Sequence, residues 1–260
     1  MKRTPILTLI SWIAIFCLCL AGCTEQAKPV ALTISANPSL KETILEVSEL
    51  YTQKKPNVTV TYNTGGATFL QEQIQQGAPV DIFVTNNQKV IKTLKSQGLV
   101  LDNYPQAFIK NQVVLITPKN STGISKFQDL TSDRVKKVAM GEPDNTQTGI
   151  YAKEVLTFFK IFEQVKKKAV FGEYSLQLVK DVAAGKADAG IVYRSDTRSS
   201  DKIKIVAVAP ENSHSSFVYH VLVIKSSKNI PYSQDFIQFL SSKKALDKLE
   251  KAGYLRVDKN

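Results

Sequence analysis

The stretch ALTISANPSLKETILEVSEL, residues 31–50, opens the pattern that decides the fold. Over residues 31–36, leucine and isoleucine alternate with small polar residues, which predicts a strand. The apolar residues between 39 and 54 then recur at helical spacing, which predicts an amphipathic helix. A strand that leads directly into a helix is the repeating unit of α/β proteins.

The same unit occurs twice more in the next 50 residues, as a strand at 58–62, a helix at 68–76, a strand at 81–85 and a helix at 88–96. Three such units predict a mainly parallel sheet with helices on both faces. Beyond Tyr104 the pattern restarts. It predicts strands at 112–116, 137–140, 189–193, 203–208 and 217–224, helices at 149–159 and 176–184, and a final amphipathic helix at about 232–252 that returns to the first domain.

The N-terminus has the features of an exported lipoprotein. Lys2 and Arg3 precede an apolar run that ends in Leu-Ala-Gly-Cys at 20–23. This pattern predicts a signal peptide over residues 1–22, lipidation of Cys23 and a lipidated tether over 23–29, since the run falls short of the ~20 apolar residues that span a bilayer. We expect the acyl chains to hold the protein at the outer face of the cell membrane or in the periplasm.

Composition excludes several classes of function. All three cysteines lie in the predicted signal segment and at its end, so the remaining chain has no disulfide, thiol nucleophile or thiolate metal site. The formal charge is +11, but the lysines are spread along the chain without the aromatic and arginine clustering of a nucleic-acid face. We therefore expect no nucleic-acid partner, and the excess of lysine suits solubility and the attraction of small anions.

Four hydroxyl residues lie where predicted helices begin: Ser39, Thr68, Thr148 and Ser175. Glu42 and Gln71 follow the first two at the spacing of a capping box. Most such residues serve only their helix. A capping hydroxyl can nevertheless also donate its proton to an anion, and helix N-termini of open α/β sheets meet at the carboxyl ends of the strands, where ligands bind.

Several ordered blocks resemble the periplasmic molybdate-binding proteins of ABC importers, within the type II periplasmic binding fold. They are SANPSLKE at 35–42, GGATFLQEQIQQGAPVDIFVTNNQK at 65–89, GEPDNTQTGIYAKEVL at 141–156 and VAAGKADAGIVYRSD at 182–196. The resemblance implies an α/β protein of two lobes, each a mainly parallel sheet flanked by helices, with a ligand cleft between them. We expect lobe I to comprise residues 30–110 and 212–260, and lobe II residues 111–211.

The resemblance also implies which residues bind molybdate or tungstate through its oxygens. Ser39 matches a serine that donates from hydroxyl and amide, and Tyr193 a tyrosine whose phenol reaches the anion. Ala67 replaces a second serine, so Thr68 is the alternative hydroxyl there. Thr148 and Ser175 match positions that donate through backbone N–H. Pro38 removes one backbone donor that the family has.

A shell of neutral donors suits a tetrahedral oxyanion that carries no proton, because each bond to a charged group contributes about 1.5–3 kcal/mol. Phosphate near neutral pH keeps a proton and needs an acceptor, and we expect its rejection although Asp144 and Asp196 are nearby in sequence. We expect a monomer without a cofactor, served by a membrane permease and its ATPase.

Three other functions compete with this interpretation. An enzyme is disfavoured because the sequence lacks GxSxG, HExxH and GxxxxGK[ST] motifs, and His220 lies in a strand-like segment while His214 is the only other histidine. A receptor for sulfate, phosphate or an organic anion stays open; Arg194, beside Tyr193, would suit a carboxylate, although its polar surroundings favour a solvated residue. A basic surface protein that binds polyanions would need its lysines on one face.

Overall fold

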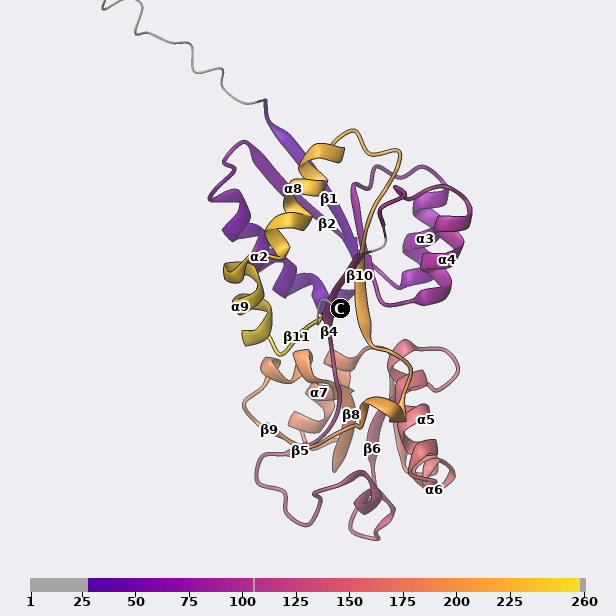
Figure 1. Ribbon diagram of the computed structural model, residues 1–260. Helices are drawn as coiled ribbons and strands as arrows, with labels where there is room; N and C mark the ends of the chain where they lie inside the picture. Colours follow the sequence, from indigo (N-terminus) through magenta and orange to yellow (C-terminus); the bar gives the residue numbers. More distant parts are fainter. Residues whose placement is uncertain (1–27, 105, 258–260) are drawn as a thin grey trace, which may run out of the picture.

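The computed structural model describes residues 28–104 and 106–257, so the predicted signal peptide and Cys23 lie outside the described residues. Two lobes are stacked end to end, each built on its own β-sheet (Figure 1). We call the part that contains the first sheet lobe I and the part that contains the second sheet lobe II. The two-lobed α/β architecture predicted from the sequence is confirmed.

Lobe I begins with three strand-to-helix units. They are β1 (Val30–Ala36), a 3₁₀ turn η1 (Pro38–Leu40), α2 (Lys41–Thr52), β2 (Val58–Thr64), α3 (Ala67–Gln75), β3 (Ile82–Thr85) and α4 (Gln88–Ser96), followed by β4 (Gln106–Lys110). The end of the chain returns to this lobe as β10 (Val218–Val223), α8 (Ile230–Leu240), α9 (Lys243–Lys251) and β11 (Leu255–Arg256). Helices α2, α8 and α9 lie on one side of the sheet, and α3 and α4 on the other (Figure 1).

Lobe II is made from the middle of the chain. Its elements are β5 (Val113–Pro118), η2 (Phe127–Thr131), β6 (Val138–Gly141), α5 (Gln147–Phe158), α6 (Phe162–Lys166), β7 (Ala169–Gly172), α7 (Ser175–Ala183), β8 (Ala189–Tyr193), η3 (Arg194–Ser199), β9 (Ile203–Val208) and η4 (Glu211–Ser213). Helix α7 covers one face of the sheet, and α5 and α6 the other (Figure 1).

Both sheets are mixed, which corrects the expectation of mainly parallel sheets. The first has the order β11-β4-β10-β3-β1-β2, with β1 parallel to β2 and β3 and the pairs that involve β10, β4 and β11 antiparallel. The second has the order β7-β6-β8-β5-β9, with β6 parallel to β7 and β8 and both pairs of β5 antiparallel. Apart from the C-terminal strand β11, the strands added in antiparallel orientation are those next to the crossings between the lobes, so only the strand-to-helix units keep the parallel arrangement.

The segments that cross between the lobes are bonded to each other. The Asn111 amide donates to the Phe217 carbonyl at 3.0 Å, and the Ala209 amide donates to the Val113 carbonyl at 2.9 Å. The Asn111 side chain also donates to the Ser195 hydroxyl at 2.9 Å. The crossing region is therefore a bonded junction, suited to act as a hinge.

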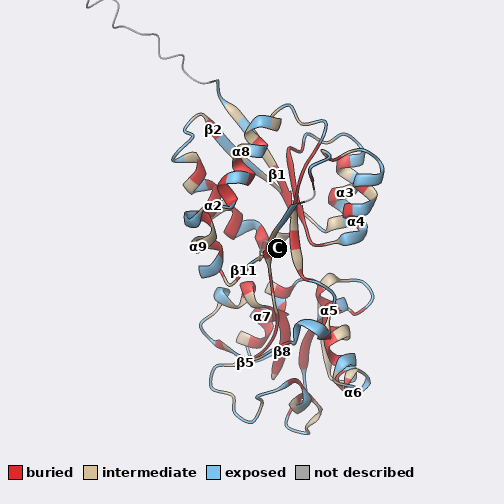
Figure 2. Ribbon diagram, viewed as in Figure 1, coloured by how far each residue is buried: buried red, intermediate tan, exposed pale blue. Residues whose placement is uncertain are grey.

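Buried residues lie in both lobes and across the junction (Figure 2). At the junction, four aromatic rings form a row: Tyr193 and Phe217 have centroids 4.6 Å apart, Phe217 and Tyr219 5.5 Å, and Tyr219 and Tyr254 6.2 Å. Edge-to-face and tilted pairs of this kind add about 0.5–1.5 kcal/mol beyond area burial. This row of rings connects β8 of lobe II, which contains Tyr193, with the C-terminal segment of lobe I, which contains Tyr254.

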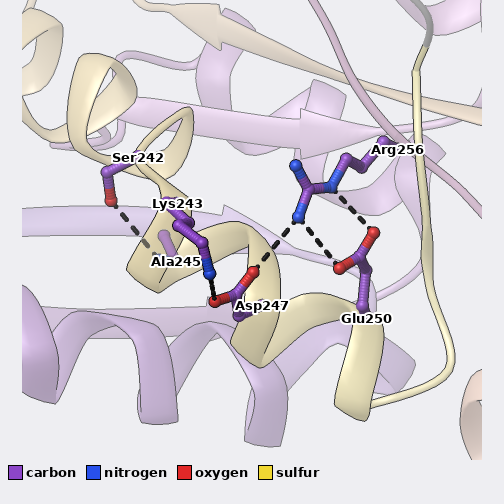
Figure 3. Close-up of polar contacts among 6 residues, drawn as sticks. All are labelled: Ser242, Lys243, Ala245, Asp247, Glu250 and Arg256. Carbon is purple, nitrogen blue, oxygen red and sulfur yellow. Dashed lines mark hydrogen bonds and ion pairs between the residues drawn. The ribbon is translucent and has the colours of Figure 1, made fainter.

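The predicted helix over 232–252 is in fact two helices. Ser241 ends α8, and the Ser242 hydroxyl caps α9 by accepting from the Ala245 amide at 3.3 Å (Figure 3). Serine favours such caps because its side chain competes with the helical backbone for hydrogen bonds. Apolar residues recur at helical spacing in both helices, so the sequence pattern did not reveal the break between them.

Charged residues join α9 to the C-terminal strand. Arg256 contacts Glu250 at 2.7 Å and Asp247 at 3.1 Å, and Lys243 contacts Asp247 at 2.6 Å (Figure 3). These side chains are exposed, so each pair contributes at most about 1 kcal/mol. Their network fixes the direction in which β11 leaves the helix.

Four short elements were not predicted: β4, α6, β7 and β11. β4 follows Pro105 and contains only one buried residue, Ile109, while β7 and β11 span four and two residues at the sheet edges. Edge strands of this length lack the alternating apolar pattern by which strands are recognised.

Candidate functional site

A cleft between the lobes lies at the carboxyl ends of their parallel strands. It has a volume of about 690 Å³, and its walls come from the segments that follow β1, β2 and β3 in lobe I and β6, β7 and β8 in lobe II. All six residues proposed from the sequence line it: Ser39, Ala67, Thr68, Thr148, Ser175 and Tyr193. The parallel core of each sheet thus directs its helix N-termini at one space, which is where open α/β sheets bind ligands.

Ser39 lies in the turn η1, directly after β1. The Asn37 side chain caps this turn by accepting from the Ser39 amide at 3.1 Å, and α2 begins two residues later at Lys41. The Ser39 hydroxyl donates to Asp196 of lobe II at 3.2 Å. The expectation that Ser39 forms a capping box with Glu42 is therefore wrong, because Asn37 caps η1 and the N-cap position of α2 is Leu40, which makes no side-chain cap.

Ala67 and Thr68 are the first two residues of α3. Gly66 occupies the N-cap position, so the capping box expected for Thr68 and Gln71 is also wrong. Within the described part of the chain, no side chain caps this helix. The first amides of a helix have no acceptor inside it, and those of α3 line the cleft with the positive end of the helix dipole.

Thr148 is the second residue of α5, two positions after the cap Thr146, whose hydroxyl accepts from the Gly149 amide at 3.0 Å. Strand β6 passes unusually close to this helix start. A Cβ atom on Gly141 would lie 2.4 Å from the Gly149 amide, and one on Gly149 would lie 2.1 Å from the Glu142 carbonyl. The two glycines therefore allow the close packing that buries Thr148 against the cleft.

Ser175 is the first residue of α7, and it is buried at 1% exposure. Its hydroxyl oxygen accepts from the Tyr193 amide at 2.8 Å. Across the described residues, no side chain caps α7, whose N-cap position is Tyr174. The helix start thus leaves amides for a ligand while the serine hydroxyl fixes strand β8.

Tyr193 ends β8 with its ring packed against Phe217 and Tyr151. Burial raises the pKa of its phenol far above the ordinary value, although a hydrogen bond with Thr148 opposes the rise. The phenol is therefore protonated at every physiological pH and can donate a hydrogen bond to an anion.

The cleft also contains residues that the sequence reasoning missed. Chief among them are Asn37, Asn86, Asn87, Lys89 and Glu173. The Asn86 amide donates to the Tyr151 hydroxyl at 3.2 Å, and the Asn87 side chain caps α4. Each asparagine follows a strand, as the predicted hydroxyl residues do, so strand-end position rather than side-chain type was the signal available.

Charges around the cleft are mixed. Lys89, in the first turn of α4, lines it, and so do the carboxylates of Glu173 and Asp144. Asp144 is paired with Lys153 at 2.9 Å, which lowers its pKa. Asp196 lies behind Ser39 at 5% exposure, and burial raises its pKa to about 6.

The residues that would favour other functions lie elsewhere. Arg194 is half-buried and donates to the Gln112 side chain at 2.8 Å, so it is not the solvated residue expected from its neighbours. His220 is on β10, where burial lowers its pKa, and His214 lines a neighbouring groove. Over residues 28–104 and 106–257, no cluster of His, Cys, Asp and Glu could hold a metal ion.

Among the residues that the structure describes, every helix is too short or too polar to cross a bilayer.

Comparison with known proteins assigns the family. The sequence model of the bacterial extracellular solute-binding proteins matches residues 32–255. The chain belongs to this family. The resemblance seen in the sequence is thus confirmed at the level of the family, and the cleft is placed in a solute-binding protein.

Relatives of this solute-binding protein align over most of their length. A putative ABC transporter substrate-binding lipoprotein of Bacillus subtilis is 33% identical over 91% of this chain and 93% of its own. A molybdate-binding protein of Haemophilus influenzae is 30% identical over 83% of this chain and 86% of its own. The solved substrate-binding domain of a putative molybdenum ABC transporter from Clostridium difficile is 41% identical, with a TM-score of 0.79 over 88% of this chain and all of that one.

Proposed function

We propose that this solute-binding protein captures molybdate or tungstate in the interlobe cleft and delivers it to the permease and ATPase of an ABC importer. The observation that carries the proposal is the convergence of the α3 and α7 N-termini with the Tyr193 phenol on one cleft. Two relatives described as proteins of molybdate binding or molybdenum transport support the choice of ligand.

The donors suit an anion that has only acceptors. The proposed contacts are the hydroxyl of Ser39 or Thr68, the amides of Ala67, Thr148 and Ser175, and the phenol of Tyr193. A buried dianion is tolerated only when hydrogen bonds replace its hydration. Donors from both lobes provide these bonds once the lobes close on the ligand by a hinge motion at the crossing segments.

The proposed selectivity depends on whether an anion carries a proton and on the size of the anion. Hydrogen phosphate needs an acceptor for its proton, but of the two carboxylates at the cleft wall Asp144 is engaged with Lys153 and Glu173 with the Tyr174 hydroxyl. We therefore propose that phosphate binds poorly. Sulfate has the charge and shape of molybdate but is smaller, so a receptor for sulfate or another tetrahedral oxyanion is the alternative function.

We further propose that the protein is anchored through Cys23 and acts as a monomer at the outer face of the membrane. The Leu-Ala-Gly-Cys sequence at 20–23 supports lipidation. The relative from Bacillus subtilis is also described as a lipoprotein. Metabolic labelling with a radioactive fatty acid, compared between the full chain and its Cys23→Ser variant, tests the anchor.

Isothermal calorimetry on residues 24–260 tests which ligand binds. Tryptophan fluorescence does not serve here, because the chain's single tryptophan, Trp12, lies outside these residues. Molybdate and tungstate should bind, and at ~1,000 times Kd they should stabilise the fold by about 4 kcal/mol. Phosphate and sulfate should bind at least 100-fold more weakly. Equal binding of sulfate would support the alternative function, and binding of no oxyanion would refute both.

A further inference from the structure

Asp196 is a carboxylate buried behind the cleft, where it meets Ser39 of the other lobe. It lies in η3, three residues after Tyr193, and only 5% of its surface is exposed. A buried carboxylate is costly unless it is paired or hydrogen-bonded. Here the partner from lobe I is the Ser39 hydroxyl, which donates to Oδ2 at 3.2 Å.

A second cleft residue contacts Asp196 from lobe II. The Ser175 oxygen already accepts from the Tyr193 amide, so its proton is free to be donated. Hydrogen bonds from Ser175, Ser39 and Ser195 all lower the pKa of Asp196. One of these hydroxyls, that of Ser39, is among the donors proposed for the oxyanion, so the carboxylate and the anion draw on the same proton.

The surroundings of Asp196 hold few opposing charges. Arg198 of η3 contributes a weak attraction, since its guanidinium is directed to Glu46 at 3.1 Å and Thr43 at 3.2 Å in lobe I. The other ionisable groups that face Asp196 are Tyr193 of β8, Tyr219 of β10, Tyr254 near the C-terminus, and Lys41 and Glu42 of α2. Burial outweighs the hydroxyls and Arg198, and it raises the pKa of Asp196 to about 6.

We propose that Asp196 is an affinity-determining residue that competes with the oxyanion for the hydroxyl proton of Ser39, so that proton binding at Asp196 favours anion capture. This inference rests on the proposed function. Ionised Asp196 accepts the Ser39 proton and repels the dianion. Neutral Asp196 releases it, and its own proton removes the like charge from behind the cleft.

The direction of the pH effect follows by linkage. A dianion near Asp196 favours the neutral carboxyl and raises its pKa further, so the complex holds more protons than the free protein between about pH 6 and 7.5. Affinity must then increase as pH falls through this window, and binding must take up protons. Each unit by which the anion raises the pKa of Asp196 corresponds to about a tenfold change in Kd.

The test measures Kd for molybdate by calorimetry between pH 5.5 and 7.5 on residues 24–260. We expect Kd to fall about three- to tenfold from pH 7.5 to 5.5. The Asp196→Asn variant should bind at pH 7.5 as tightly as the unmodified protein does at pH 5.5, and its Kd should not vary with pH. Asp201→Asn, an equal charge change at an exposed turn five residues away, should keep the pH dependence of the unmodified protein.

Proton uptake provides a second measurement that needs no variant. Binding heats at pH 6.5 in two buffers of different ionisation enthalpy should show net uptake of protons by the unmodified protein. Absence of uptake, a Kd that does not change with pH, or an unchanged pH dependence in Asp196→Asn would each overturn the inference while leaving the ligand assignment intact. Absence of molybdate binding at every pH would overturn the proposed function and this inference together.

Discussion

The candidate donors that lobe I contributes to the cleft are half-exposed or exposed, whereas those of lobe II are buried. Thr148, Ser175 and Tyr193 are 6%, 1% and 3% exposed, and Ser175 and Tyr193 are bonded to each other. Ser39 and Ala67 are half-buried and Thr68 is exposed. Lobe II thus holds its donors in place through its own packing, while the donors of lobe I stay more accessible to solvent.

This comparison indicates in which lobe a substitution should change both the ligand affinity and the stability of the protein. A change in the wall of lobe II removes packing or an internal hydrogen bond as well as a ligand contact. A change in the wall of lobe I removes mainly the contact, because water can replace the lost bonds. Preorganised donors lower the cost of binding, so we expect lobe II to be the lobe that engages the anion first.

The largest effect is expected for Tyr193→Ala. Loss of a ring buried against Phe217 and Tyr151 should lower the free energy of unfolding by about 3–5 kcal/mol. Urea titration followed by far-UV circular dichroism measures it. Tyr193→Phe is the matched control: it keeps the ring, so most of the stability should remain, while Kd for molybdate rises about tenfold. An unfolding midpoint of Tyr193→Ala equal to that of the unmodified protein would contradict the packed wall.

Ser175→Ala should have the next largest effect. It leaves the buried Tyr193 amide without its acceptor, which costs about 1–3 kcal/mol of stability. The same urea titration measures the loss. A variant as stable as the unmodified protein would show that the hydroxyl does not hold β8 in place.

Ser39→Ala is the counterpart in lobe I. We expect a stability loss of at most about 1 kcal/mol, because Ser39 is half-exposed and the buried Asp196 keeps the hydroxyls of Ser175 and Ser195, together with about a tenfold rise in Kd for molybdate. Calorimetry measures the change in Kd, and urea titration measures the change in stability. If stability falls more than it does for Ser175→Ala, the two walls do not differ as described.

Thr68→Ala should have the smallest effect. Thr68 is exposed in the first turn of α3, and surface changes of this kind stay within about 0.5 kcal/mol in stability. Kd should change less than about threefold, since the amides of α3 remain. A tenfold rise in Kd would instead show that Thr68 is a principal donor. Its hydroxyl would then replace the one that is missing at Ala67.

The sequence predicted the larger elements and the strand-end location of the site, because both follow from periodicity and from the geometry of strand-to-helix units. It misplaced the caps: Leu40, Gly66 and Thr146 occupy the N-cap positions assigned to Ser39, Thr68 and Thr148. Helix starts shift by one or two residues with local turn geometry, which spacing alone does not encode. The contact between Ser39 and Asp196 was also beyond prediction, since 157 residues separate the two and only the stacking of the lobes brings them together.

Lobe I is built from two separate stretches of the chain, and this sets the order in which the two walls of the cleft can fold. Every strand of lobe II lies between residues 113 and 208, so its sheet can assemble once that stretch has emerged from the ribosome or the export channel. The sheet of lobe I pairs β3 with β10 and β4 with β11, and it must wait for residues 255–256. Contacts so distant in sequence form slowly. The packed wall should therefore mature early, and the Ser39 wall should be the last part of the cleft to reach its final form.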